Sequence, residues 1–465
     1  MKGKELLAHL YSSKAAELFT SLYGKDEVDV ERRRYCRLVE ELLMDESGGF
    51  PHTEFPESAG ELRFFSVPGR TELGGNHTDH NRGKVLAASI QLDAVALVAP
   101  RHDKQVFFRS AAYPDAKVDV SDLAPKKGEK GSTASLVRGI AAEFTARGTP
   151  VGGFTANAAS TVLSGSGLSS SAAIEVLIAK IFDNLYCGGK RSALELAQIG
   201  QKAENVYFGK PCGLMDQTAC ASGGAVAIDF ADSQNPRVKG IAFHPAAAGF
   251  ALCVVDTKAN HADLTPDYAA IPAEMKAAAA FYGKTVLGEL DEGALLKQLP
   301  ELRKAAGDRA VLRALHFFNE NRRVDAMLAA LENMNALAPG QKGKAMETFL
   351  SLVTESGDSS WELLQNIYSP KNPGEQGVSL ALALTKNFLN SGGSRDSFAG
   401  KHTGACSGKH TGACRVHGGG FAGTIQAYLP LERLDEYRIL MEGIFGKGTL
   451  TVLRIRQLGA IELDF

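Results

Sequence analysis

Charge of one sign, cysteine and long apolar runs are all scarce in this 465-residue sequence, and each shortage excludes a class of protein. The 51 Lys and Arg residues nearly balance the 53 Asp and Glu residues, which leaves a net charge of −2. So small an excess gives no electrostatic reason to expect nucleic acid or an acidic membrane as a partner. No stretch approaches the run of about 18 apolar residues that a membrane span requires.

Seven cysteines in a chain of this length do not make a disulfide framework, and an odd number cannot all pair internally. A reduced, cytoplasmic setting is therefore expected. Met1–Leu10 lacks a continuous apolar core and a small-residue cleavage site, so we expect no secretory signal. What remains is an ordinary globular composition with 44% hydrophobic residues, in a chain long enough to favour two domains.

The hydrophobic pattern predicts helices and strands in both halves of the chain. We expect strands at 62–67, 85–98, 153–162, 225–230, 250–256, 424–428 and 449–455. We expect helices at 4–44, 134–144, 168–186 and 194–204, and a mostly helical stretch rich in Ala and Leu at 269–352. The predicted fold class is α+β, with an N-terminal domain over 1–235 and a C-terminal domain over 236–465.

A short tandem repeat stands near the C-terminus, where Gly400–Cys406 recurs as Gly408–Cys414. It produces a series of potential zinc ligands at every fourth residue: His402, Cys406, His410 and Cys414. The flanking glycines disfavour a helix there, and the duplication generates the regular spacing by itself. We therefore favour a duplicated surface loop, where an insertion costs little, over a zinc site.

A segment rich in Gly and Ser, Ser164–Ala173, precedes the helix predicted at 168–186. Glycines let the backbone approach a ligand, and the first turn of a helix offers unpaired N–H groups and a positive dipole end to a phosphate. The three hydroxyls of Ser169–Ser171 can add hydrogen bonds or a ligand for Mg²⁺. The segment is no Walker loop, and Ser170 stands where a dinucleotide fingerprint needs its third glycine. Taken alone it could also be a simple helix cap.

Three further segments combine glycines with polar side chains. Pro68–Asn81 is densely polar between two apolar runs, which suits a loop that presents donors and acceptors to a polyol. Gly209–Gln217 places Asp216 among small and apolar residues, and a buried carboxylate there would need a partner such as arginine to stay ionised. Arg415–Gly423 is a loop that exposes its backbone before a strand. Each of these could be an ordinary turn if it stood alone.

Together, in this order and at this spacing, the four segments resemble those of the galactokinases, within the wider family of galactokinase, homoserine, mevalonate and phosphomevalonate kinases. The likeness runs from about Phe64 to Tyr428. The matched segments are Arg70–Asn81 (the galactokinase signature), Gly165–Ala173 (the shared phosphate loop), Pro211–Gln217 (the segment of the catalytic Asp) and Gly418–Gly423 (the C-terminal glycine motif). The resemblance implies an N-terminal domain like ribosomal protein S5 domain 2 and a ferredoxin-like C-terminal domain, with the active site between them.

Carried over position by position, the resemblance implies an ATP-dependent sugar 1-kinase that uses Mg²⁺, with galactose as the expected sugar. Asp216 would be the catalytic carboxylate and Arg70 its partner. The residues that would contact the sugar are Asn76, His77, Asp79, Gly213 and Tyr268. Those that would bind the nucleotide are Gly165, Ser166, Gly167, Leu168, Ser169, Ser170 and Ser171. Ser171 and Glu204 would hold Mg²⁺.

Two departures keep alternatives open. Asn76 stands where galactokinases usually have a Glu near C6 of the sugar, and the loss of that charge leaves a galacturonate kinase as a rival. Thr133 replaces a tryptophan that lies beside adenine in some relatives, so ATP is expected without being assured as the sole donor. A sugar sensor on a kinase scaffold is a further alternative, although the serine run and Asp216 are intact. The expected partners are a small-molecule sugar and a nucleotide, with neither nucleic acid nor membrane, for a monomer or weak homo-oligomer.

Overall fold

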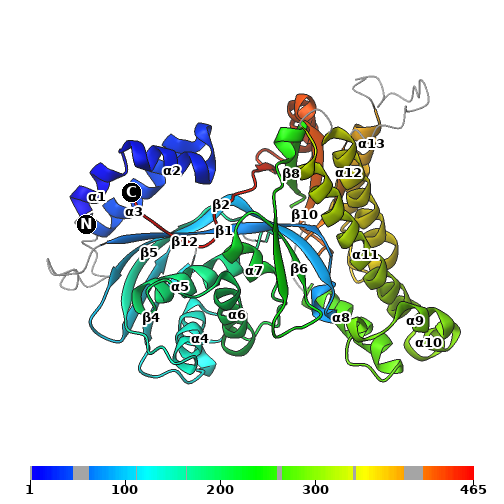
Figure 1. Ribbon diagram of the computed structural model, residues 1–465, viewed down its shortest axis with the longest axis horizontal. Coiled ribbons are helices and arrows are strands. Elements are labelled where there is room, and N and C mark those ends of the chain that lie inside the picture. The colour runs from blue at the N-terminus through cyan, green and yellow to red at the C-terminus, as the bar shows by residue number, and fades with distance from the viewer. Residues whose placement is uncertain are drawn as a thin grey trace.

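Helices pack around two β-sheets in the computed structural model, which describes residues 3–44, 62–111, 113–163, 165–258, 264–338, 342–391 and 412–465 (Figure 1). Among these residues the larger sheet has eight strands, in the order β12-β1-β2-β5-β3-β4, with β6 paired to β2 and β7 to β6. The smaller sheet has four described strands, in the order β11-β8-β10-β9. The α+β class expected from the sequence is confirmed.

The strands of the larger sheet are β1 (Arg63–Gly74), β2 (Lys84–Pro100), β3 (Gln105–Ser110), β4 (Tyr113–Asp119), β5 (Phe154–Ser160), β6 (Ala225–Asp229), β7 (Arg237–Ile241) and β12 (Ile461–Leu463). Those of the smaller sheet are β8 (Phe250–Asp256), β9 (Ala413–His417), β10 (Thr424–Pro430) and β11 (Leu450–Leu453). The helices of the first half are α1 (Gly3–His9), α2 (Ser13–Tyr23), α3 (Val28–Met44), α4 (Thr133–Ala146), α5 (Ser170–Tyr186), α6 (Ala193–Ala203) and α7 (Met215–Ser222). Those of the second half are α8 (Thr265–Phe281), α9 (Glu292–Lys297), α10 (Leu299–Ala306), α11 (Asp308–Ala336), α12 (Lys342–Ser359), α13 (Gly377–Asn390) and α14 (Leu434–Phe445).

β1 and β2 form the long antiparallel pair at the centre of the larger sheet. Every residue of β1 after Arg63 is buried, so the strand lacks the alternation of polar and apolar residues that a half-exposed strand shows. The reason is that helices cover both faces: α5 and α7 contact one face, and α2 and α3 contact the other (Figure 1). Polar side chains on β1 are therefore carried into the interior, where each needs a partner.

The two ends of the chain meet on the face covered by α2 and α3 (Figure 1). Phe19 of α2 packs on Tyr35 of α3 with ring centroids 5.0 Å apart, and Tyr35 packs on Phe64 of β1 at the same distance. Phe465, the last residue, adds its ring 5.7 Å from that of Phe64. The N-terminal helices are therefore an integral layer of the larger sheet's core.

Beneath this aromatic layer lies a buried carboxylate, Asp93 of β2, which is fully enclosed. Arg34 donates to it at 2.6 Å and Arg456 at 2.9 Å, while Tyr23 and Ser66 donate through their hydroxyls. Burial alone would raise the pKa of Asp93, but the two guanidinium groups outweigh it and hold the pKa below its usual range. The charge thus ties α2, α3, β1 and the C-terminal segment to one point.

The smaller sheet has a core of its own, in which Val255, Ile425, Phe388 and Tyr437 are buried together. α11 and α12 connect this core to the larger sheet, since α11 contacts β1 and β2 while α12 contacts β9 (Figure 1). Two strands from beyond residue 235, β7 and β12, pair within the larger sheet. The domain boundary placed at residues 235 and 236 stays a prediction, and the larger sheet draws on both sides of it.

Most predicted elements are present, with differences that have local causes. The region expected to be helical over 4–44 is divided into three helices, because the Ser12 side chain caps α2 and Gly24 ends it with a φ of 91°. The strand expected at 62–67 continues to Gly74 through a register shift between Pro68 and Arg70. β3, β4, β7, β9 and β12 were not predicted, and they are short or rich in polar residues.

The described residues also bear on two expectations about composition. None of their helices combines the length and the apolar character that crossing a bilayer demands. Their cysteines are all free thiols. Of the four potential zinc ligands, His402, Cys406 and His410 lie outside the described residues, and Cys414 is buried in β9.

Replacement of Asp93 with Asn should lower the free energy of unfolding by about 3–5 kcal/mol, since the buried Arg456 loses its counter-charge and Arg34 keeps only that of Glu31. Urea unfolding followed by circular dichroism measures the change. Asp29→Asn is the matched control, because Asp29 pairs with Arg32 while its side chain is 77% exposed, and an exposed pair contributes about 1 kcal/mol or less. Equal losses in the two variants would contradict the role assigned to Asp93.

Candidate active site

The segment Gly165–Ser171 comprises the end of the turn between β5 and α5 and the first two residues of α5. Gly165, Gly167 and Ser169 adopt left-handed backbone, with φ of 75°, 71° and 62°. Ser169 is the N-cap of α5, yet its side chain makes no capping hydrogen bond with the described residues. The first N–H groups of a 17-residue helix are therefore available to an anion. Ser164, the first residue of the expected loop, lies outside the described residues.

The nucleotide-binding residues predicted from the sequence differ in exposure. Gly165 and Ser171 are exposed and Ser170 is partly so, whereas the side chains of Ser166 and Leu168 are buried. The Ser166 hydroxyl donates to the carbonyl of Leu163 at 2.7 Å, which tightens the turn. Ser166 and Leu168 can thus offer a ligand only their backbone.

This turn lies against β1 because glycine stands at position 69. A Cβ there would lie 2.8 Å from the Leu168 carbonyl oxygen, too close for any other residue without a shift. The next residue, Arg70, donates its backbone N–H to the same carbonyl at 3.1 Å. The register shift in β1 falls at this point, and such irregularities redirect side chains near functional sites.

Asp216, in the first turn of α7, meets two of the segments singled out from the sequence. Arg70 donates to its Oδ1 from Nε at 2.9 Å and from Nη2 at 2.7 Å. The Ser169 hydroxyl donates to Oδ2, and Arg70 also donates to the carbonyl of Gly167. The arginine partner that a sheltered Asp216 would need is therefore present, and it also holds the phosphate loop.

The electrostatics of this group keep the carboxylate ionised. Burial acts to raise the pKa of Asp216, but the charge of Arg70 and the hydrogen bond from Ser169 outweigh it and hold the pKa below its usual range. The Asp216 side chain is nevertheless 34% exposed, whereas that of Arg70 is 6% exposed. The carboxylate is thus an anchored anion that still faces solvent, as a group that must meet a substrate requires.

Glu204, the expected metal ligand, begins the π-helical turn Glu204–Phe208 after α6 and is buried. Its Oε1 pairs with Lys210 at 3.3 Å, and its Oε2 accepts a hydrogen bond from Gln217 at 3.1 Å. The same Gln217 nitrogen donates to Glu175 at 2.9 Å, and Glu175 lies one turn after Ser171 on α5. Gln217 thus joins Glu204 to the helix that carries the other expected ligand.

A second carboxylate, that of Glu175, lies close to Glu204, and ionising both of these buried groups costs free energy. Burial, together with the neighbouring charge of Glu204, raises the pKa of Glu175 well above its usual range. Within the described residues no three His, Cys, Asp or Glu side chains gather as a metal cage. That does not conflict with Mg²⁺, which proteins usually hold through one or two carboxylates while phosphates and water complete the shell.

Asp79 and Gly213, both expected to contact a sugar, are neighbours. A Cβ on Gly213 would lie 1.8 Å from Oδ2 of Asp79, so glycine is what allows this approach. Asp79 is in the short helical turn Asp79–Asn81, and its Oδ1 accepts the backbone N–H of His80 at 3.0 Å. The signature loop and the loop that precedes Asp216 therefore meet at this point.

His77 and Tyr268 converge on the C-terminal glycine motif. Nε2 of His77 lies 3.0 Å from the carbonyl of Gly419, and the Tyr268 hydroxyl donates to the carbonyl of Gly420 at 3.0 Å. Burial lowers the pKa of His77 to about 4, so the ring is neutral at pH 7. Its Nε2 is then the donor to the carbonyl, and Nδ1 is the acceptor side.

Asn76 differs from the other expected sugar contacts in that it is 1% exposed and both its amide nitrogen and its amide oxygen form hydrogen bonds within the protein. Its Nδ2 donates to the Glu72 carboxylate and, at 2.8 Å, to the Gly418 carbonyl. Its Oδ1 accepts from Asn366 at 2.8 Å. The amide belongs to a buried network that ties the signature segment to the glycine motif.

Several residues of the site were not found from the sequence. Gln217 adjoins Asp216, so its position beside the catalytic segment was a signal that could have been used. Lys210 lies within the same segment. Asn366 carries no sequence signal, because it lies 290 residues from Asn76 and meets it only in the folded chain.

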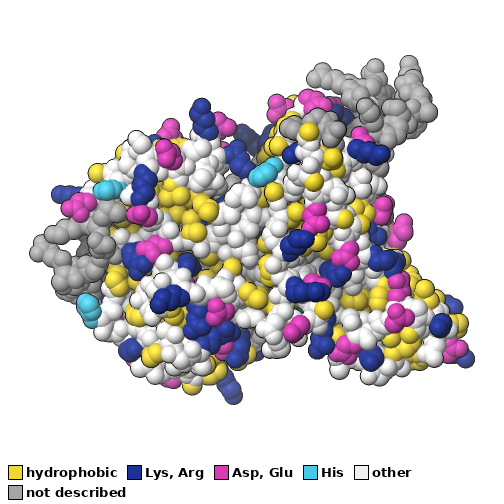
Figure 2. Space-filling model, in the orientation of Figure 1, with side chains coloured by type: hydrophobic (Ala, Val, Ile, Leu, Met, Phe, Trp, Pro, Cys, Tyr) yellow, Lys and Arg dark blue, Asp and Glu magenta, His cyan; other side chains and the backbone are white. Residues whose placement is uncertain are grey.

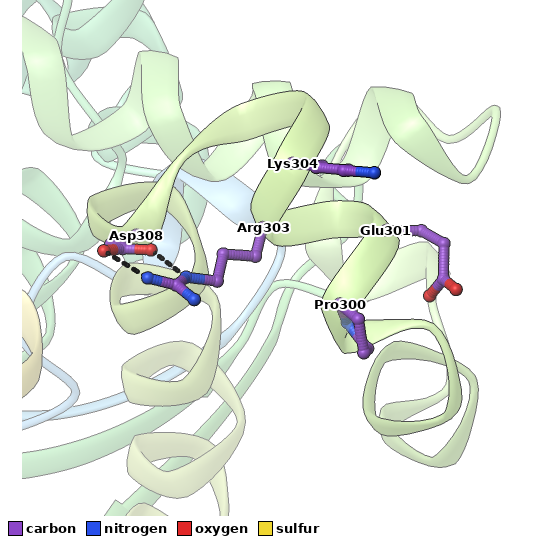
Figure 3. Close-up of a pocket in the computed structure, with 5 residues that line it drawn as sticks. All are labelled: Pro300, Glu301, Arg303, Lys304 and Asp308. Atoms are coloured by element: carbon purple, nitrogen blue, oxygen red, sulfur yellow. Dashed lines mark hydrogen bonds and ion pairs between the residues drawn. The ribbon is translucent and has the colours of Figure 1, made fainter.

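A pocket elsewhere on the molecule is separate from these residues. It lies at α10 and the start of α11, and Figure 3 shows its lining: Pro300, Glu301, Arg303, Lys304 and Asp308. Arg303 donates to Asp308 across it, and both side chains are largely exposed. On the face seen in Figure 2, both basic and acidic side chains are spread over the surface.

Replacing Arg70 with Met should destabilise the fold in a pH-dependent way. A folded-state pKa below the unfolded value means that Asp216 contributes stability above about pH 4, which is lost as pH falls through the folded value. The free energy of unfolding should therefore fall by about 2 kcal/mol in Arg70→Met at pH 7, and by less at pH 3.5. A fully buried pair would lose about 3–5 kcal/mol, and the value is lower here because Asp216 is partly exposed to solvent.

Urea unfolding at the two pH values measures this difference. Arg303→Met is the matched control, since the Arg303 and Asp308 side chains are 70% and 67% exposed. It should show little change at either pH. A loss in Arg70→Met that does not depend on pH would contradict the proposed electrostatics.

Comparisons with known proteins agree with this arrangement. The model of the GHMP kinases N terminal domain matches residues 132–224, and that of the galactokinase galactose-binding signature matches residues 52–100. The galactokinase of Streptomyces coelicolor is 37% identical over 280 residues, which cover 59% of this chain and 70% of that protein. The galactokinase of Mycobacterium tuberculosis is 33% identical over 304 residues, 63% of this chain and 80% of that protein.

Solved structures share the fold. A structure of Lactococcus lactis galactokinase complexed with galactose matches with a TM-score of 0.69 at 22% identity, covering 97% of this chain and 99% of that one. The mevalonate kinase of Methanococcus jannaschii matches with a TM-score of 0.55 at 13% identity, covering 85% and 99% of the two chains. The extent of the match to the bacterial relatives shows that the chain belongs to the galactokinase family and is a sugar kinase.

Proposed function

We propose that the protein is a galactokinase, which transfers the γ-phosphate of ATP to the anomeric hydroxyl of galactose. The observation that carries this proposal is the contact of Asp216 with both Arg70 and Ser169. It places an ionised, partly exposed carboxylate directly beside the turn that is suited to phosphate. The bacterial relatives are galactokinases and the solved homologue is a galactokinase in complex with galactose, which supports the choice of sugar.

The nucleotide's phosphates would lie on the turn Gly165–Ser171. Left-handed glycines keep side chains away from the ligand, and the open N–H groups at the start of α5 would bind the phosphate oxygens. Phosphoryl transfer passes through a loose transition state, so positioning and charge neutralisation account for most of the catalysis. A rigid turn, fixed to β1 by Arg70, supplies the positioning.

Asp216 would face the anomeric hydroxyl of the sugar. Since its pKa lies below the usual range, the carboxylate is charged at pH 7 and is a weak base. It is therefore suited to orient the hydroxyl as a hydrogen-bond acceptor and to take the proton late, once bonding to phosphorus has made the oxygen acidic. Arg70 would keep the carboxylate ionised and in place.

The residues present fit a Mg²⁺ ion bound mainly through the nucleotide. The exposed Ser171 hydroxyl and the Glu204 carboxylate are the oxygen ligands that this ion prefers. Bound there, Mg²⁺ would offset the charge of the triphosphate. Gln217 and Lys210 hold Glu204 in position.

The sugar would lie where Asp79, His77 and Tyr268 converge. The Asp79 carboxylate is an acceptor for hydroxyl groups, and the neutral His77 ring offers Nδ1 as an acceptor nitrogen. Gly213 would leave room beside Asp79. These groups can form hydrogen bonds with sugar hydroxyls and include no cation to pair with a sugar carboxylate, which suits a neutral sugar.

Asp216→Ala should lower kcat by about 10²–10⁴-fold, because the hydroxyl loses its acceptor while the sugar keeps its other contacts. ADP release measures turnover, and calorimetry should show that galactose still binds within about threefold of the wild-type affinity. Asp232→Ala, an exposed aspartate in the loop after β6, is the control. A kcat for Asp216→Ala close to the wild-type value would rule out the assigned role.

The substrate itself is tested by ADP release from the wild-type protein with galactose, galacturonate, arabinose and N-acetylgalactosamine side by side. We expect the highest kcat/KM with galactose and a product phosphorylated on the anomeric oxygen. A clear preference for another sugar would replace galactose in the proposal and leave the sugar kinase assignment intact.

A further inference from the structure

Three successive carbonyls of the turn before α5 are held by other parts of the protein. The Gly167 carbonyl accepts from the Arg70 side chain, and the Leu168 carbonyl accepts the Arg70 backbone N–H at 3.1 Å. The Ser166 carbonyl is instead held from the smaller sheet, because the Thr424 hydroxyl of β10 donates to it at 2.8 Å. The turn is therefore fixed from both sheets.

The direction of these carbonyls decides where the N–H groups of the turn point. A peptide unit is planar and trans, so its C=O and the N–H that follows point in opposite directions. Holding the carbonyls of Ser166, Gly167 and Leu168 therefore turns the next N–H groups, up to that of Ser169, away from the residues that hold them. None of these three N–H groups has a hydrogen-bond partner among the residues that the structure describes, so they are available to an anion.

His417 of β9 stands behind Thr424. The two residues are paired across β9 and β10, and Nδ1 of His417 lies 3.1 Å from the Thr424 hydroxyl. On the other side of the ring, Nε2 lies 3.0 Å from the hydroxyl of Thr71, which accepts from Nε2 of Gln426 at 2.7 Å. The four residues are each 2% exposed or less, so solvent does not compete for these hydrogen bonds.

The hydrogens in this chain of side chains have one consistent arrangement. The Ser166 carbonyl can only accept, so the Thr424 hydroxyl uses its single hydrogen there and accepts from Nδ1–H of His417. Burial, together with the charges of two nearby arginines, lowers the pKa of His417 to about 3, so the ring is neutral at pH 7. Nε2 then carries no hydrogen, and it accepts from the Thr71 hydroxyl.

We propose that His417 and Thr424 are positioning residues for the nucleotide, which fix the Ser166 carbonyl and thereby point the Gly167 N–H at the phosphates. The proposal rests on the proposed function, because it takes the triphosphate to lie on this turn. Glycine at position 167 leaves the peptide free to rotate, and its φ of 71° is a conformation that glycine adopts readily. The hydrogen bond from Thr424 restricts that freedom to one orientation.

The close approach of His417 to the turn supports this role. A Cβ on Gly167 would lie 3.0 Å from Nδ1 of His417, so the ring packs directly against the backbone that it helps to orient. Gly418–Gly423, the C-terminal glycine motif, joins His417 to Thr424 and brings the two into register across β9 and β10. The motif therefore sets the spacing of the pair that holds the phosphate turn.

Thr424→Val tests the proposal, because it removes the hydroxyl, keeps the branched shape of the side chain and leaves the Ser166 carbonyl without its donor. Calorimetry measures the Kd of a non-hydrolysable ATP analogue, and ADP release measures KM for ATP and for galactose. The Kd and the KM for ATP should each rise about 5- to 10-fold, as for one lost hydrogen bond, while KM for galactose stays within about twofold.

Thr385→Val is the matched control. Thr385 of α13 is fully buried, and its hydroxyl lies 2.6 Å from that of Tyr437 in the core of the smaller sheet. The two variants thus lose the same kind of buried hydroxyl group, but Thr385 does not contact the turn. The Kd of the ATP analogue should therefore be unchanged in Thr385→Val, even where the unfolding midpoint falls.

Two variants of His417 test the direction of the hydrogen bonds. Asn carries its amide nitrogen as many bonds from the backbone as Nδ1, so His417→Asn can still donate to Thr424. The amide of Gln reaches as far as Nε2, so His417→Gln can replace only the bond to Thr71. The Kd of the ATP analogue should therefore rise less in His417→Asn than in His417→Gln, and this comparison decides the matter if Thr424→Val does not fold.

The outcomes for the variants and for the wild type are distinct. A wild-type Kd in Thr424→Val, an equal rise in Thr385→Val, or a rise in His417→Asn that matches that in His417→Gln would overturn the positioning role. These results leave the proposed function intact. A wild type that binds the ATP analogue but phosphorylates no sugar would instead overturn the proposed function, and the variants would still decide the role of His417 and Thr424. A wild type that binds no nucleotide would overturn both.

Discussion

The guanidinium group of Arg70 is the constraint on which the site depends. It holds Asp216 through two hydrogen bonds and the phosphate turn through the Gly167 carbonyl, while its backbone N–H binds the Leu168 carbonyl. One side chain on the central strand thus fixes the distance between the Asp216 carboxylate, which we propose faces the acceptor, and the turn, which we propose binds the donor. Such fixed geometry is what a reaction with a loose transition state needs most.

The burial of charge explains how the rest of the fold serves this arrangement. Arg70 and Glu72 of β1 are buried because helices cover both faces of the sheet. Oppositely charged side chains from distant parts of the chain pair with them. Asp216 forms an ion pair with Arg70, and Arg415 forms an ion pair with Glu72. On the face of the sheet covered by α2 and α3, buried Asp93 also forms ion pairs, and these join the N-terminal helices and the C-terminal segment to β2. Each pair links segments that are far apart in sequence, so the charges specify which segments meet.

Local sequence chemistry was enough to predict much of this. That a sheltered Asp216 needs a partner such as arginine follows from the chemistry of a buried carboxylate, and the resemblance to galactokinases named Arg70 as that partner. The helices α4, α5 and α6 were predicted from the sequence pattern, and phosphate binding at glycines 165 and 167 and the serine run stays a prediction. The hydrogen bond of Asn366 to Asn76 could not be predicted, because nothing near Asn366 in the sequence marks a loop that packs against Asn76. Short strands such as β3 and β12 were missed for a related reason, since their partners on the sheet define them more than their own residues do.

The proposed function requires the turn Gly165–Ser171 and the adjoining Asp216 to face the donor and the acceptor of a single reaction. A crystal structure of the protein with galactose and a non-hydrolysable ATP analogue tests it most directly. The account predicts the terminal phosphate on the Gly165–Ser171 turn and the anomeric oxygen within hydrogen-bond distance of the Asp216 carboxylate. A sugar or a nucleotide bound elsewhere, with Asp216 facing neither, would contradict it.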